Sequence, residues 1–121
     1  MKTVNKIYSN GEFVSPHGTE IYNLINPSNN EKIGELTLAD ATDTRNAIAA
    51  AKFAFRTFSK STVSERIDYL TKLKTAIEKR KQDFIDSMIE EYGGTHQFVT
   101  MSNAHTGAWF DSNRTETTYS G

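Results

Sequence analysis

The sequence predicts an α+β protein in which short strands and turns come first and helices follow. Residues 1–39 carry β-branched and aromatic residues that are interrupted by Asn-Gly and Asn-Pro turn signals. Apolar residues at three- and four-residue steps then recur through residues 40–110, as in amphipathic helices. Residues 111–121 are polar and without period, so we expect a tail there. A length of 121 residues predicts a single domain.

The strand region contains two predicted hairpins. Asn10-Gly11 lies between two short apolar pieces in residues 6–14, and this dipeptide favours a two-residue hairpin turn. Residues 20–26 are rich in β-branched and aromatic residues and are followed by a proline, which favours an extended strand that ends in a turn. In residues 32–38, Ile33, Glu35 and Thr37 alternate with Gly34, Leu36 and Leu38, which favours a strand that forms the second half of this hairpin.

The helical region begins at Asp40 or Thr42, either of which can accept hydrogen bonds from the first free amides of a helix. This alanine-rich helix should end near Phe58. A shorter helix is expected from His96 to Phe110, although Gly107 weakens it.

Between these two helices, the sequence predicts a single long helix from Val63 to Tyr92. Thr62 and Glu65 have the spacing of a capping box at its start, and Gly93-Gly94 supplies its end. A helix of about 30 residues is roughly 45 Å long. Such a helix needs a large neighbour to cover its apolar stripe.

Composition excludes several classes of partner. The 14 Lys and Arg residues nearly balance the 15 Asp and Glu residues, so we expect neither nucleic acid nor a membrane surface as a partner. The sequence has no cysteine, and it shows neither the apolar core of a signal peptide nor an apolar run of about 20 residues. These features predict a cytoplasmic protein without disulfides.

No catalytic motif stands out among the polar residues. The histidines His17, His96 and His105 are scattered, and the basic cluster of residues 72–81 is interleaved with acidic residues at ion-pair spacing. That cluster favours a solvated helix face over a phosphate site. Glu90 and Glu91 are adjacent on a helix and therefore point in different directions.

Several short pieces, in order, resemble the N-terminal segment of the NAD(P)+-dependent aldehyde dehydrogenase family. The similarity is collinear over about residues 6–94. Its pieces are Asn10-Gly11-Glu12-Phe13-Val14, Ile25-Asn26-Pro27, Glu31-Lys32-Ile33-Gly34-Glu35, the stretch from Ala47 to Phe55, and Glu65-Arg66. The resemblance implies an incomplete part of that family's α/β fold.

The resemblance also implies a function for the protein to which such a segment belongs. Family enzymes are similar in oxidising an aldehyde to a carboxylic acid with NAD or NADP, through a cysteine nucleophile. No residue here matches a catalytic or cofactor-binding position, so we expect no activity and no nucleotide cofactor for this chain alone. The implied partner is the rest of a dehydrogenase subunit or another copy of this chain.

A structural Na+ or K+ is the one ligand that the resemblance brings to these residues. It would be held by the backbone carbonyls of Leu24 and Ile25 and by the carboxylate of Glu91, which replaces the aspartate common in the family.

The alternative to a dehydrogenase segment is a noncatalytic helical module for interaction or oligomerisation.

Overall fold

The computed structural model describes residues 1–116, with side chains described up to residue 109. The chain forms two compact units, Met1–Lys60 and Ser61–Gly121. The predicted change from strands to helices at residues 39 and 40 agrees with the end of the last strand at Thr37 and the start of the first helix at Ala41, and it lies inside the first unit. In the described part of the chain, no helix combines the length and the apolar character needed to cross a membrane.

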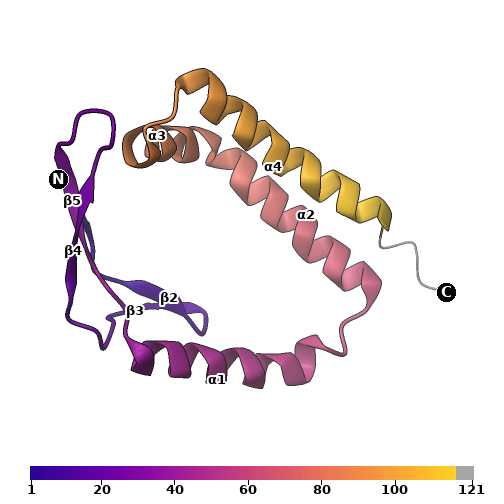
Figure 1. Cartoon of the computed structure of the whole chain (residues 1–121). Helices are drawn as coiled ribbons and strands as arrows, with labels where there is room; N and C mark the ends of the chain where they lie inside the picture. The colour runs from indigo at the N-terminus through magenta and orange to yellow at the C-terminus, as the bar shows by residue number, and fades with distance from the viewer. Residues whose placement is uncertain (117–121) are drawn as a thin grey trace. The chain divides into compact units, whose positions relative to one another are not determined.

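The first unit contains two small sheets and one helix. Strands β1 (Lys2–Val4), β5 (Lys32–Thr37) and β4 (Ile21–Ile25) form a three-stranded sheet in that order, with β1 parallel and β4 antiparallel to β5. Strands β2 (Ile7–Ser9) and β3 (Glu12–Val14) form a separate hairpin (Figure 1). Both predicted hairpins are therefore confirmed, whereas β1 was not predicted.

The turn between β2 and β3 has the backbone that its sequence demands. Asn10 has φ of 53° and Gly11 has φ of 81°. Positive φ at both central residues is the signature of a type I′ turn, whose twist matches that of the flanking strands. Gly34 is buried in β5, the central strand of the larger sheet, and its lack of a side chain lets β1 approach closely. A Cβ at this position would lie only 2.5 Å from the Lys2 carbonyl oxygen.

Helix α1 (Ala41–Phe58) completes the first unit and confirms the first predicted helix. Asp40 is its N-cap, and the capping box is closed by Asp43 rather than by a glutamate. The expected apolar stripe is present but uncovered: Ile48 is 61% exposed and Phe55 is 65% exposed.

The second unit consists of three helices, α2 (Val63–Lys79), α3 (Lys81–Tyr92) and α4 (His96–Glu116). Helix α4 packs against both α2 and α3 and runs back along α2 (Figure 1). Its Val99 is fully buried, and Ile85 of α3 is 3% exposed. The turn into α4 is made by Gly93 in the left-handed conformation, with φ of 73°.

Two helix boundaries differ from the prediction. The single helix from Val63 to Tyr92 is divided at Arg80, where φ is −110° and ψ is 18°. Residues 78–83 are all polar, so no buried side chain holds this stretch in one straight helix. Helix α4 continues to Glu116, six residues into the predicted tail, and residues 117–121 lie outside the described part.

Candidate functional site

The densest polar cluster in the first unit lies at the N-terminus of α1. Asp43 is 8% exposed and accepts hydrogen bonds from three backbone amides, those of His17 (2.8 Å), Gly18 (3.1 Å) and Asp40 (2.9 Å). Asp40 accepts the amides of Thr42 and Asp43 through Oδ1. Its Oδ2 lies 2.6 Å from Nδ1 of His17. We call these three residues, His17, Asp40 and Asp43, the α1 cap cluster.

Hydrogen bonding sets the charges of the α1 cap cluster. The hydrogen bond to Asp40, followed by the attraction of that carboxylate, raises the pKa of His17. The hydrogen bond from His17, followed by those from the backbone amides, lowers the pKa of Asp40. The pKa of Asp43 is lowered chiefly by the hydrogen bond from the His17 amide. Both carboxylates are thus held ionised at the positive end of the helix dipole.

The cluster borders a cavity of about 390 Å³, but its chemistry is structural. Ser9, Ser15 and Asn46 also line this cavity. The Ser15 hydroxyl accepts a hydrogen bond from the Lys6 ammonium at 2.7 Å, and both carboxylates are engaged in the cap. The arrangement lacks a nucleophile paired with a general base. It fastens the loop of residues 15–19 to the start of α1.

The residues expected to bind a cation are distributed over both units. Leu24 and Ile25 lie at the end of β4, where the ladder is irregular because Leu24 opposes Gly34 and Ile25 opposes Lys32. Glu91 is an exposed residue in the last turn of α3, in the second unit. The cation site therefore stays a prediction. Among the described residues, no group of three or more His, Cys, Asp or Glu side chains has a metal-binding arrangement.

The remaining sequence candidates lie on helix surfaces. His96 and His105 are exposed on α4. In the basic cluster, Lys72 pairs with Asp68 at 2.6 Å and Arg80 pairs with Asp83 at 2.9 Å. These ion pairs at helical spacing confirm the predicted solvated face.

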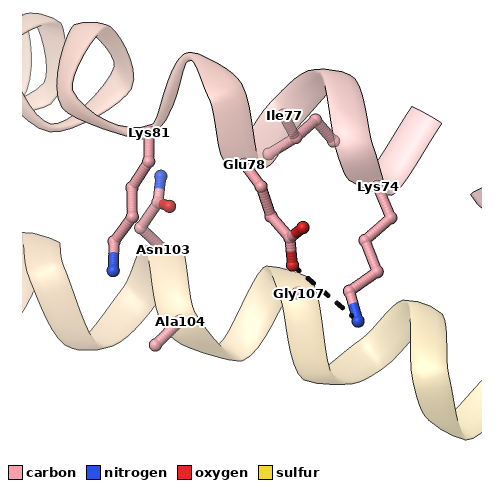
Figure 2. A pocket seen from close by; sticks show the side chains of 7 residues that line it. All are labelled: Lys74, Ile77, Glu78, Lys81, Asn103, Ala104 and Gly107. Carbon is pink, nitrogen blue, oxygen red and sulfur yellow. Dashed lines mark ion pairs between the residues drawn. The ribbon is translucent and has the colours of Figure 1, made fainter. Parts of the chain in front are cut away.

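One part of the basic cluster borders a small cavity that the sequence did not reveal. This cavity, which we call the helical pocket, measures about 110 Å³ and lies where α2, the start of α3 and α4 meet (Figure 2). Glu78 and Lys74 form a loose ion pair across it, with 3.8 Å between Oε1 and Nζ. Its lining residues are Lys74, Ile77, Glu78, Lys81, Asn103, Ala104 and Gly107.

Large apolar side chains are widely exposed in both units. In the first unit the hairpin residues Tyr8 and Phe13 stack edge to face yet remain 66% and 73% exposed. In the second unit Phe98 and Met101 of α4 are 54% and 58% exposed. Exposed apolar surface of this extent is typical of a face that another chain segment or protein covers.

Comparisons with known proteins identify the origin of this fold. The aldehyde dehydrogenase family model matches residues 13–115. A candidate aldehyde dehydrogenase of Staphylococcus haemolyticus is 32% identical over 93 residues, which are 77% of this chain and 20% of that protein. The chain thus spans about a fifth of the length of the curated relatives that it matches.

Solved structures show the same fold. An aldehyde dehydrogenase from Bartonella henselae matches with a TM-score of 0.94 and 24% identity, over 100% of this chain and 26% of that one. An NAD-dependent benzaldehyde dehydrogenase from Corynebacterium glutamicum matches with a TM-score of 0.87 and 21% identity, over 95% of this chain and 25% of that one. None of these matches supports the alternative of an unrelated helical module. The chain belongs to the aldehyde dehydrogenase family, and it corresponds to the family's N-terminal segment.

Proposed function

We propose that this chain is the N-terminal scaffold of an NAD(P)+-dependent aldehyde dehydrogenase subunit and is not catalytic by itself. The family match over residues 13–115 carries the proposal. In such a subunit an aldehyde is oxidised to a carboxylic acid, with NAD or NADP accepting the hydride. The family's cysteine nucleophile has no counterpart in these 121 residues. The chain's own contribution is packing surface.

The exposed apolar face of α1 supports this role. Ile48 and Phe55 project from a helix that Asp40 and Asp43 cap at its N-terminus, and both side chains are more than half exposed. Burying one such side chain contributes about 1.5–3 kcal/mol. Covering this face with the rest of a subunit would stabilise both parts.

An activity assay tests the catalytic part of the proposal. The purified chain, supplied with a panel of aldehydes and either NAD+ or NADP+, should form no NAD(P)H above the rate without protein. A dehydrogenase related to the matched structures serves as the positive control. Aldehyde-dependent turnover that follows the purified chain would contradict the proposal.

We also propose that the chain contributes a Na+ or K+ site through the Leu24 and Ile25 carbonyls and the Glu91 carboxylate. These oxygen donors suit a hard cation, and Leu24 and Ile25 lie at the end of β4, where the ladder with β5 shifts its register. The expected result is a melting temperature that is several degrees higher in KCl or NaCl than in choline chloride. Glu91→Gln should abolish this difference, whereas the neighbouring Glu90→Gln should keep it; equal melting temperatures in all three salts would refute the site.

A further inference from the structure

The helical pocket combines an apolar wall with two hydrogen-bond donors that have no partner among the described residues. Within the described residues, neither the Lys81 ammonium nor the Asn103 side-chain amide makes a hydrogen bond or an ion pair. Figure 2 shows these two side chains next to each other at one end of the pocket. Ile77 and Ala104 supply apolar surface, and Gly107 leaves the α4 side open. The arrangement offers a charged end and an apolar end.

The charges of the pocket favour a monoanion. Lys74 and Lys81 contribute two positive charges and Glu78 one negative charge, so the lining carries a net charge of +1. Glu78 engages Lys74 at 3.8 Å, which leaves the Lys81 end as the positive end. A dianion such as phosphate would be repelled by the Glu78 carboxylate and would leave the apolar wall without a contact. A carboxylate with a short aliphatic tail would satisfy both ends.

The size of the pocket limits the ligand further. At about 110 Å³ it is well below the 300–1,000 Å³ that is typical of sites for drug-sized molecules. We propose that the helical pocket binds a short-chain aliphatic carboxylate of about two to four carbons. Its carboxylate accepts hydrogen bonds from Lys81 and Asn103, and its tail lies against Ile77 and Ala104. This site is independent of the dehydrogenase reaction and uses none of its residues.

Nuclear magnetic resonance titration of the full chain tests the proposal directly. Sodium butyrate should shift the Asn103 side-chain amide and the backbone amides of residues 103–107 saturably, with a dissociation constant on the order of a millimolar. Sodium chloride and sodium phosphate at the same ionic strength should not. Butyrate shifts no larger than those of chloride, or tighter binding of phosphate, would overturn the proposal.

Three variants locate the binding site. Lys81→Gln should weaken butyrate binding about tenfold, because it removes a charge-assisted hydrogen bond. Lys79→Gln removes the same charge from α2 outside the pocket and should leave binding unchanged. Gly107→Leu should abolish binding, since a Cβ at residue 107 meets nothing within 4 Å and the larger side chain can fill the pocket.

The Gly107→Leu variant also separates loss of binding from loss of folding. Leucine is a better helix former than glycine, so α4 should be at least as stable as before. Circular dichroism of each variant checks this point. If Gly107→Leu still binds butyrate with wild-type affinity, the ligand lies elsewhere and the assignment is wrong.

Discussion

At the scale of single residues, Asp43 organises the first unit. One nearly buried carboxylate accepts the amides of two loop residues and of the N-cap residue, and thereby joins the loop before β4 to the start of α1. A carboxylate has two oxygens and about four acceptor positions, so it can receive three donors. A neutral amide of the same size offers a single oxygen.

Replacing Asp43 by asparagine should therefore destabilise the chain. The substituted side-chain amide could accept fewer of the three backbone donors, and its own N–H groups would face other N–H groups. We expect the melting temperature to fall by several degrees. Asp86→Asn is the matched control, because Asp86 is exposed and accepts one side-chain hydrogen bond, from Gln82. Equal melting temperatures for the two variants would show that Asp43 is not a structural anchor.

The pair of His17 and Asp40 predicts a pH dependence of stability. The pKa of His17 is raised by Asp40, with Asp43 adding attraction, so folding favours the protonated imidazole. The resulting stabilisation is fully present below the unfolded-state pKa of about 6.5 and is lost as the pH rises through the higher folded-state pKa. Urea unfolding of the wild type and of His17→Gln at several pH values measures it.

The free energy difference between wild type and His17→Gln should be largest near pH 5.5 and should shrink above the folded-state pKa. The same experiment in an Asp40→Asn background is the control, since the ion pair is already absent there. A difference that is constant with pH, or one that is equally large in the Asp40→Asn background, would rule out the pair as its source.

Substitution of two glycines by alanine should change stability in opposite directions. A Cβ at Gly34 would lie 2.5 Å from the Lys2 carbonyl oxygen and 2.8 Å from the Lys2 Cβ, whereas one at Gly107 meets nothing within 4 Å. Gly34→Ala should destabilise the chain by about 1–3 kcal/mol, because β1 must move away from β5. Gly107→Ala should stabilise it by about 0.5–1 kcal/mol. Chemical denaturation measures both, and a stabilising Gly34→Ala would refute the close approach of β1.

Only part of this residue-scale detail could be predicted from the sequence. Asp40 and Asp43 are recognisable near a helix start, because capping preferences act over three residues. The hydrogen bonds from His17 and Gly18 are not, since they join residues that are about 25 positions apart and leave no periodic signal. The pairing of Lys81 with Asn103 in one pocket escapes prediction for the same reason, as it depends on how α4 packs on α2 and α3.

At the scale of secondary-structure elements, local signals were sufficient wherever turn or cap chemistry is explicit. The Asn10-Gly11 turn and the Thr62–Glu65 capping box were both predicted and are both formed. The break between α2 and α3 was not predicted from the sequence, because the apolar residues Ile77, Phe84 and Ile85 have the spacing of one continuous helix. Arg80 is no preferred cap, and Pro and Gly, the usual causes of such a break, are absent from residues 78–83.

Amide hydrogen exchange tests the break at Arg80. The first amides of α3, residues 81–83, lack helical acceptors if a new helix begins at Lys81, and no side chain caps them. We expect these three amides to exchange at least about tenfold faster than those of residues 71–77 in α2. Uniform protection from residue 71 through residue 86 would instead indicate one continuous helix.

At the scale of the whole molecule, the small number of buried apolar side chains and the many exposed ones favour a chain that packs against further protein. Among the described residues, the buried hydrophobic side chains are those of Ile85 and Val99. Large apolar side chains on α1, α4 and the β2–β3 hairpin remain more than half exposed. The sequence predicted the amphipathic stripes and, for residues 63–92, the need for a large neighbour to cover one of them. Which side chains are exposed could not be predicted, because exposure depends on which neighbours are present.

A chimera tests the central claim that this chain is a dehydrogenase scaffold. In it, residues 13–115 replace the structurally equivalent segment of the Corynebacterium glutamicum benzaldehyde dehydrogenase, whose fold they match. A matched chimera carries the corresponding segment of the Staphylococcus haemolyticus relative at the same junctions. This control shows whether the host accepts a divergent segment of the family at all.

The decisive measurement is the rate of benzaldehyde-dependent NADH formation by the two purified chimeras and by the host enzyme without its N-terminal segment. Our account predicts that both chimeras are active and that the truncated host is inactive. An active Staphylococcus chimera beside an inactive or unfolded chimera of this chain would contradict the claim.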